Sequence, residues 1–399
     1  MALCLFAAYA LSACSDDNDV PKIDDEEPPV TEISVPTPNP YLAAEHYSIT
    51  HFNSAQTDAF PYAVKSGTYP INPDECDGIW SGPVNLMTLS STDPDYMWGM
   101  CSDRVSYIRI ADGGFKRVAE AALPNGIQMN SEEGLKKLVN TQYTSTEQLY
   151  ADATEILGRY PQMAMSNGNY VLCDKDNYAY TNARTVICRY KLKEAGNPAA
   201  GIILDKQIDM SPYMENPQTL VGMVMTYDGY LVVAAGNGIA IIDREFSKTP
   251  VVKLLPDDQV ITNSASVDEQ NGIYIASNSR TPGGKGIMHK YIWKDGKLSE
   301  DENDGAWTAH YDGGPEAPAI KMGYGTGSTP TLMGFGDDED KLVVITDGSK
   351  RMKLVAFWRD EIPEDAVSVD AGNPRIAGQL EISCGLPSST EWVQSEQSV

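Results

Sequence analysis

The sequence predicts an all-β chain in which a four-stranded unit recurs, and three observations support this prediction. Short apolar runs repeat along the chain, tight Asp-Gly or Asn-Gly turns follow the first run of several units, and looser loops follow the second. The clearest copy has the turn Asp228-Gly229 and runs at 221–227, 230–235, 239–243 and 251–255. One such unit cannot bury both faces alone, so its copies must stack, and a β-propeller is the closed way to stack them.

Five units of this kind can be placed, with β-branched and aromatic residues in the runs and Gly, Asn or Asp between them. They span residues 83–122, 162–208, 221–255, 264–311 and 329–381. In the second unit the predicted strands are 162–166, 170–174, 186–191 and 201–208. Residues 391–399 have the composition of an inner strand of a partial sixth unit. We therefore expect a partial propeller, truncated from seven or eight blades.

Residues 131–158 lie between the first two units and have a composition typical of helices. Thr144 and Glu147 fit a capping box, in which each side chain satisfies a backbone N–H of the first turn. The sequence therefore predicts a small helical insertion on one rim of the propeller.

Acidic residues outnumber basic ones, 56 against 30, which gives a formal net charge of −26 at pH 7. This excess opposes binding to phosphate backbones and to anionic lipid headgroups. Nucleic acid is therefore excluded as a general partner. The simplest interpretation of the charge is a well-solvated surface.

The first residues are typical of a secretion signal, because the apolar run at 3–10 is too short to span a bilayer. Leu11-Ser12-Ala13-Cys14 follows and resembles the lipobox of bacterial lipoproteins, which implies cleavage before Cys14 and lipidation of Cys14. The acidic, proline-containing stretch that comes next buries little apolar surface and predicts an extended tether. The expected organisation is a signal peptide at 1–14, a tether at 15–40 and a partial propeller at 41–399.

Five cysteines remain after such processing: Cys76, Cys101, Cys173, Cys188 and Cys384. Their odd number and wide spacing argue against a disulfide framework or a zinc site. Cys173 and Cys188 fall on predicted neighbouring strands, so a disulfide between them is one interpretation. Buried free thiols are the other.

Two stretches resemble a group of secreted bacterial β-propellers. The first is Asn263-Ser264-Ala265-Ser266-Val267-Asp268 with Gly272-Ile273-Tyr274, and the second runs from Gly325 to Gly334 and on to Val344-Ile345-Thr346-Asp347. The group is quinoprotein-like, strictosidine-synthase-like or gluconolactonase-like, and the similarity covers residues 160–399. The resemblance implies the blade architecture, and function must then come from the site.

Basic residues recur in the second-to-third loops of the units, which share one face of an up-and-down propeller. They are Arg104, Arg184, Arg280, Lys285, Lys350 and Arg351, and Asn237 takes the corresponding place in the third unit. Arginine binds carboxylate and sulfate groups bidentately, so this mouth is predicted to bind an anionic small molecule or glycan. The alternative interpretation is a set of ordinary solvated loop residues.

The links that enter the inner strands place Asn263 close to the predicted axis. The gluconolactonase-like resemblance implies calcium held there by Glu, Asn and Asp oxygens, and Asn263 best fits such a role. The alternative is that Asn263 caps the backbone at the start of a strand.

The sequence shows no serine elbow, Cys–His pair or metal-type His cluster. The leading prediction is therefore an outer-membrane lipoprotein of the cell envelope, periplasmic or surface-exposed, that binds an anionic small molecule, a saccharide or an envelope protein. The alternative is a calcium-dependent hydrolase or lyase that acts on a lactone, ester or acidic glycan.

Overall fold

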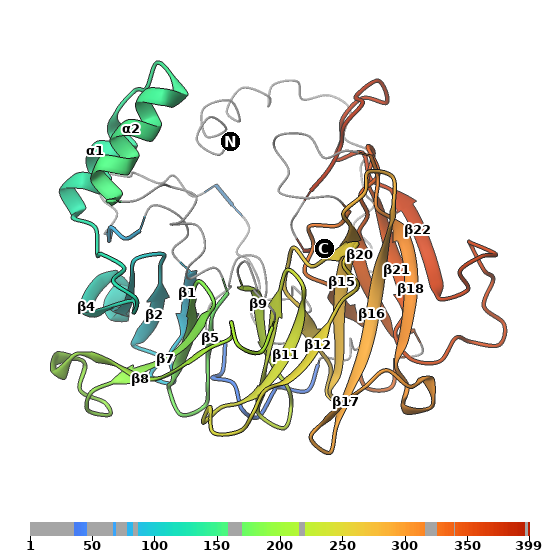
Figure 1. The fold of residues 1–399 in the computed structure, drawn as a ribbon, viewed down its shortest axis with the longest axis horizontal. Coiled ribbons are helices and arrows are strands. Elements are labelled where there is room, and N and C mark those ends of the chain that lie inside the picture. The colour runs from blue at the N-terminus through green and yellow to red at the C-terminus, as the bar shows by residue number, and fades with distance from the viewer. Residues whose placement is uncertain are drawn as a thin grey trace.

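The structure, a computed structural model, describes residues 36–45, 67–68, 78–82, 87–158, 170–214, 220–315, 325–338, 340–395 and 398–399. Its strands form five consecutive antiparallel sheets, and Figure 1 shows them side by side in chain order from left to right. In each sheet the main strands follow one another as neighbours. The protein is therefore an all-β propeller of four-stranded blades, as the repeat predicts.

The blades are numbered in chain order. The first contains β1 (Met87–Ser90), β2 (Tyr96–Met100), β3 (Arg104–Arg109) and β4 (Lys116–Ala122). The second contains β5 (Leu172–Cys173), β6 (Ala179–Ala183), β7 (Val186–Leu192) and β8 (Ile202–Asp209). The third contains β9 (Leu220–Met225), β10 (Tyr230–Ala235), β11 (Gly238–Asp243) and β12 (Val251–Leu254).

The fourth and fifth blades complete the described set. The fourth contains β14 (Ser266–Val267), β15 (Gly272–Ser279), β16 (Lys285–Lys294) and β18 (Trp307–Asp312), with the added strands β13 (Gln259–Val260) and β17 (Lys297–Ser299). The fifth contains β19 (Thr331–Met333), β20 (Leu342–Thr346), β21 (Lys353–Trp358) and β22 (Ile376–Glu381).

The second blade differs from the sequence prediction by one strand. Residues 170–174 contain the first strand, β5, and not the second, whereas the predicted first strand at 162–166 lies outside the described residues. The second strand, β6, was missed because its sequence, AYTNA, has no continuous apolar run. All five of its residues are nevertheless buried. Cys173 and Cys188 are free thiols, and β6 separates their strands.

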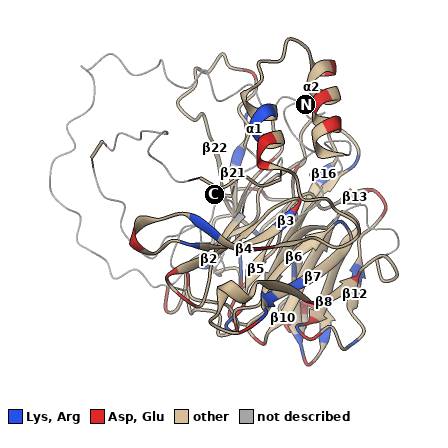
Figure 2. Ribbon diagram, turned by 90° about the vertical axis from the view of Figure 1, so that its left-hand side faces the viewer, with Lys and Arg blue, Asp and Glu red and all other residues tan. Residues whose placement is uncertain are grey.

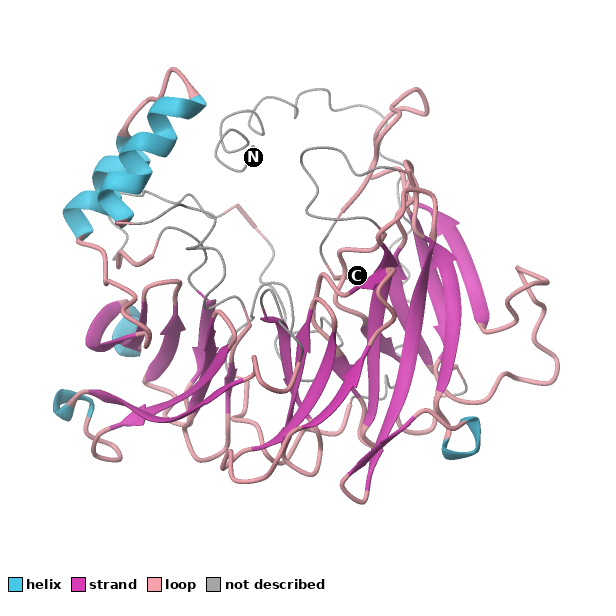
Figure 3. Ribbon diagram, in the orientation of Figure 1, coloured by secondary structure: helices cyan, strands magenta, loops and turns pink. Residues whose placement is uncertain are grey.

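The helical insertion consists of α1 (Glu132–Asn140) and α2 (Thr146–Leu157), which Figure 3 shows above the first blade. The predicted capping box at Thr144 is displaced by one residue, because the Ser145 hydroxyl accepts from the Gln148 N–H at 3.2 Å. Gly158 ends α2 with a left-handed φ of 63°. The helices pack on one another through Leu135, Ala153 and Leu157.

Apolar side chains fill the space between successive blades. One buried cluster joins the first three blades, a second joins the third to the fourth, and a third joins the fourth to the fifth. In the last of these, Tyr274 of β15 and Phe357 of β21 are fully buried. The stacking of faces that the repeat requires is therefore what forms the core.

Polar contacts also join the blades, at the turns between first and second strands. Trp98 Nε1 donates to Asn177 Oδ1 at 2.9 Å between the first two blades. Arg244 Nη1 pairs with Asp174 Oδ2 at 2.9 Å between the second and third. Trp293 Nε1 donates to Asp228 Oδ2 at 3.1 Å between the third and fourth. These turns thus hold neighbouring blades together as well as reversing the chain.

The segment at residues 36–45 crosses the same turns of the second and third blades. Asn39 Nδ2 donates to Met225 O at 2.9 Å, and the Ala43 N–H donates to Cys173 O at 3.0 Å. Residues 36–40, which the sequence assigns to the tether, are therefore docked on the blades. The rest of the predicted tether and Cys14 lie outside the described residues.

A buried chain of hydrogen bonds runs through the fourth blade. His289 contacts the Ser277 hydroxyl at 3.0 Å through Nε2 and the Tyr291 hydroxyl at 3.3 Å through Nδ1. Ser277 in turn donates to Gln259 Oε1 at 2.8 Å. Burial lowers the pKa of His289 to about 4, because the charged imidazolium would lose its hydration there.

This burial predicts a pH-dependent stability. In the unfolded chain His289 binds a proton below about pH 6.5, whereas in the native state it stays neutral until about pH 4. The free energy of unfolding is therefore expected to fall as the pH drops from about 6.5 to about 4. The contribution of His289 to this fall is about 3 kcal/mol. Denaturant unfolding at several pH values should show a shallower decline for His289→Gln. Equal declines in the two proteins would contradict the prediction.

Candidate functional site

The predicted mouth lies on the face that carries the second-to-third loops. Arg104 is at the start of β3, but its guanidinium is buried among carboxylates. It pairs with Asp103 Oδ2 at 2.8 Å and Glu120 Oε2 at 2.9 Å, and it also donates to Asn130 O. This arginine joins β3 and β4 to the segment that precedes α1.

The second and third blades place their predicted residues in tight turns. Arg184 is exposed between β6 and β7, with a left-handed φ of 58°. Asn237 lies between β10 and β11, and its Nδ2 donates to Met214 O at 2.5 Å. Asn237 therefore holds the link from the second blade in place.

The remaining mouth cations lie in the fourth and fifth blades and contact neighbouring acceptors. Lys285 pairs with Asp312 at 2.5 Å, Arg351 pairs with Glu381 at 2.7 Å, and Lys350 pairs with Glu391. Arg280 Nε donates to Asp257 O at 3.1 Å. Figure 2 shows acidic and basic positions interspersed along the ribbon. Exposed pairs of this kind are weak enough for a ligand to displace, so anion binding at this mouth stays a prediction.

Asn263 lies on the link between β13 and β14. Its Oδ1 accepts from the Ser264 N–H at 2.8 Å, from Thr329 Oγ1 at 2.9 Å and from the Tyr170 hydroxyl. Its Nδ2 donates to Gly327 O. In this arrangement the amide joins the links of three blades, and calcium binding at Asn263 stays a prediction. Among the described residues, no group of three or more His, Cys, Asp or Glu is placed to hold a metal ion.

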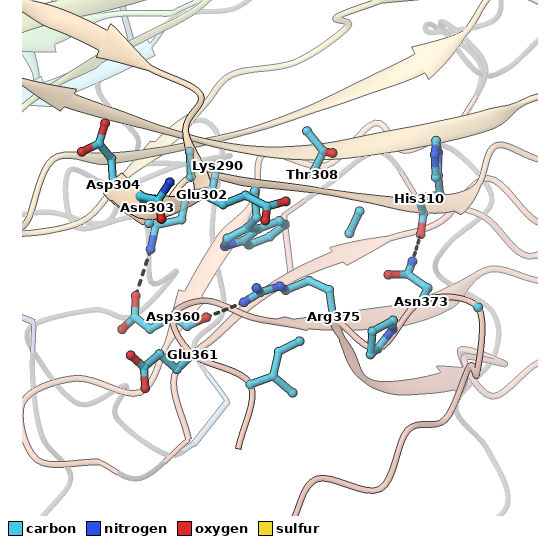
Figure 4. Close-up of a pocket in the computed structure, with 17 residues that line it drawn as sticks. Lys290, Glu302, Asn303, Asp304, Thr308, His310, Asp360, Glu361, Asn373 and Arg375 are labelled. Carbon is cyan, nitrogen blue, oxygen red and sulfur yellow. Dashed lines mark hydrogen bonds and ion pairs between the residues drawn. The ribbon is translucent and has the colours of Figure 1, made fainter. Parts of the chain in front are cut away.

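A cleft of about 790 Å³ lies between the outer strand of the fourth blade and the loop that connects β21 to β22. Figure 4 shows Asn373 and Arg375 on one side and the strand of Thr308 and His310 on the other, with these two side chains directed away from Arg375. The alternation of β18 turns Trp307 toward Arg375, whereas Thr308 and His310 are exposed on the other face of the strand. Asn373 Nδ2 donates to His310 O at 2.6 Å and joins the two walls.

Arg375 is the central cation of this cleft. Its guanidinium carbon lies 5.0 Å from the ring centre of Trp307, within cation–π range. Its Nη1 donates to Trp358 O at 3.2 Å and to Asp360 O. Burial lowers the pKa of Arg375 below its ordinary value, which still leaves it charged at neutral pH.

Acidic residues surround one end of the cleft. Asp360 is neutralised by Lys290, whose Nζ lies 2.9 Å from Asp360 Oδ1. Glu302, Asp304 and Glu361 also line the cleft. The site therefore combines one held guanidinium with several carboxylate acceptors.

Sequence reasoning missed this cleft. None of the residues that line it is among the predicted site residues. Trp307 and Arg375 come from different blades, so no local motif joins them. The available signal was the long connection between β21 and β22, since long loops frequently carry function.

Comparison with known proteins assigns the chain to no family. No family model matches the chain. An uncharacterised protein of Archaeoglobus fulgidus is 34% identical over 192 residues, which are 47% of this chain and 34% of that protein. The match thus spans about a third of the relative's length.

Solved structures that resemble the chain are β-propeller proteins of low sequence identity. A virginiamycin B lyase of Staphylococcus aureus is 13% identical with a TM-score of 0.38, over 78% of this chain and 72% of that one. The Nup133 β-propeller domain of Vanderwaltozyma polyspora is 8% identical with a TM-score of 0.41, over 74% and 73%. A candidate 6-phosphogluconolactonase of Bacteroides uniformis is 9% identical with a TM-score of 0.39, over 73% and 70%. Their activities are not carried over to this chain.

Proposed function

We propose that this protein is an envelope-anchored β-propeller that binds a polar small molecule or saccharide. The observation that carries the binding half is the cleft between the fourth and fifth blades. Asn373 is held by His310 O, and Arg375 is held by the carbonyl oxygens of Trp358 and Asp360, so both groups are positioned before any ligand arrives. Preorganisation of this kind reduces the entropy lost on binding.

The anchoring half of the proposal rests on the sequence, through the apolar run at 3–10 and the lipobox-like residues that end at Cys14. Among the described residues, no helix is long and apolar enough to cross a membrane. We expect the protein to fractionate with membranes through lipid on Cys14. Cys14→Ser should release it into the soluble fraction.

Binding is tested by calorimetry of the full chain against a panel of neutral sugars, sugar acids, lactones and amino acids. We expect saturable binding of at least one polar member, with the ligand recovered unchanged by mass spectrometry. Conversion of a lactone, ester or glycan that requires added Ca²⁺ would instead support the hydrolase or lyase alternative. If no member of the panel binds, the proposal is wrong.

A further inference from the structure

We propose that the cleft between the fourth and fifth blades binds the carboxylate of a sugar acid, with Arg375 as the anion-binding residue. This inference rests on the proposed function and assigns it a site and a ligand class.

Arg375 is held as a receptor for a planar oxyanion. Its Nη1 donates to the carbonyl oxygens of Trp358 and Asp360, and one face of its guanidinium lies near Trp307. No ion pair joins Arg375 to a carboxylate within the part of the chain that the structure describes. The Nε and Nη2 donors have no hydrogen bond to a described residue. They form the edge of the fork that a carboxylate binds bidentately.

The rest of the lining selects among anions. Glu302, Asp304 and Glu361 surround the same cleft, and Glu302 is close enough to act electrostatically on Arg375. A dianion such as phosphate would be repelled by these carboxylates more strongly than a monoanion. Carboxylates are, however, good acceptors for hydroxyl donors. A ligand with one carboxylate and several hydroxyl groups satisfies both parts of the site, and a sugar acid has this composition.

Asn373 offers a further polar contact in the cleft. Its Nδ2 donates to His310 O, and its side-chain oxygen can accept from a ring hydroxyl. The volume of about 790 Å³ is within the range of small-molecule sites and leaves room for one or two sugar rings.

The test compares matched ligands by calorimetry with the full chain. D-galacturonate is the probe, D-galactose is the same ring without the carboxylate, and L-alanine is a carboxylate with an ammonium group in place of hydroxyls. We expect galacturonate to bind at least about tenfold more tightly than galactose or L-alanine. Equal binding of galactose, or tighter binding of L-alanine, would overturn the assignment to a sugar acid.

Three variants locate the site. Arg375→Lys keeps the charge but loses the fork, and Arg375→Gln loses both. We expect each to weaken galacturonate binding about tenfold or more without changing the response to galactose. Arg109→Gln is the control, because this exposed arginine of the first blade pairs with Asp112 outside the cleft, and it should leave galacturonate binding unchanged. Circular dichroism and thermal melting establish that each variant folds.

The outcomes separate the two proposals. If a panel ligand binds the wild-type protein and Arg375→Lys binds it equally well, the cleft is the wrong site while the proposed binding function stands. If galacturonate and all other panel members fail to bind the folded wild-type protein, both proposals fail.

Discussion

Asp174→Ala is expected to lower the free energy of unfolding by about 3 to 5 kcal/mol. The carboxylate is fully buried in the first-to-second turn of the second blade. Its Oδ1 accepts from the Asp176 and Tyr178 N–H groups at 2.9 and 3.0 Å. Its Oδ2 accepts from the Tyr180 hydroxyl at 2.9 Å and pairs with Arg244 of the next blade at the same distance. Alanine would leave all four donors without this acceptor.

Chemical denaturation followed by tryptophan fluorescence measures this loss. Asp176→Ala in the same turn is the matched control, since its carboxylate is 45% exposed and pairs with Lys175 at the surface. We expect Asp176→Ala to lower the free energy of unfolding by about 1 kcal/mol or less. A loss for Asp174→Ala no larger than the control's would show that the turn does not hold the two blades together.

Gly348→Ala is expected to lower the free energy of unfolding by at least about 3 kcal/mol, or to prevent folding. The reason is that the added methyl group would overlap with backbone atoms instead of a flexible side chain. A Cβ on Gly348 would lie 2.6 Å from the Gly313 carbonyl carbon and 2.6 Å from the Gly325 Cα, and it would also contact the Gly313 oxygen. The Gly348 N–H donates to Asp312 O at 2.9 Å, and the Gly325 N–H donates to Gly313 O at 2.9 Å. These bonds hold the fourth and fifth blades in close backbone contact.

Gly378→Ala provides the comparison. Gly378 lies within β22, and a Cβ there has no heavy atom within 4 Å. We expect that variant to be neutral or stabilised by a few tenths of a kcal/mol, since alanine restricts the unfolded chain more than glycine does. Thermal melting of both variants measures the difference. If Gly348→Ala has the same melting temperature as the wild type, the backbone contact between the fourth and fifth blades can shift to accommodate the methyl group, and the prediction is wrong.

The third blade shows how much of the fold local pattern predicts. Its strands pair as expected, with Tyr230 opposite Asp243 and Leu231 opposite Met225. Its apolar runs are continuous, and the turn Asp228-Gly229 supplies a glycine with a φ of 87°. Prediction fails in the second blade, where the buried strand β6 contains Thr181 and Asn182. Their burial depends on the neighbouring blades and leaves no apolar run in the sequence.

The mouth cations show what loop position leaves open in a sequence prediction. Several contact an acceptor that is distant in sequence, as for Arg351 with Glu381 and Lys350 with Glu391. Loop position indicates the face of a propeller on which a side chain lies. It does not indicate which acidic group lies beside it.

The order of apolar runs and tight turns determined the blade architecture, because strand length, alternation and turn geometry are set within a few residues of each other. Only the tertiary structure decided which polar groups face an open space. The guanidinium carbon of Arg375 in the fifth blade lies 5.0 Å from the ring centre of Trp307 in the fourth. Their contact depends on how one sheet packs against the next, and that packing is set by apolar area summed over both faces instead of by any short motif.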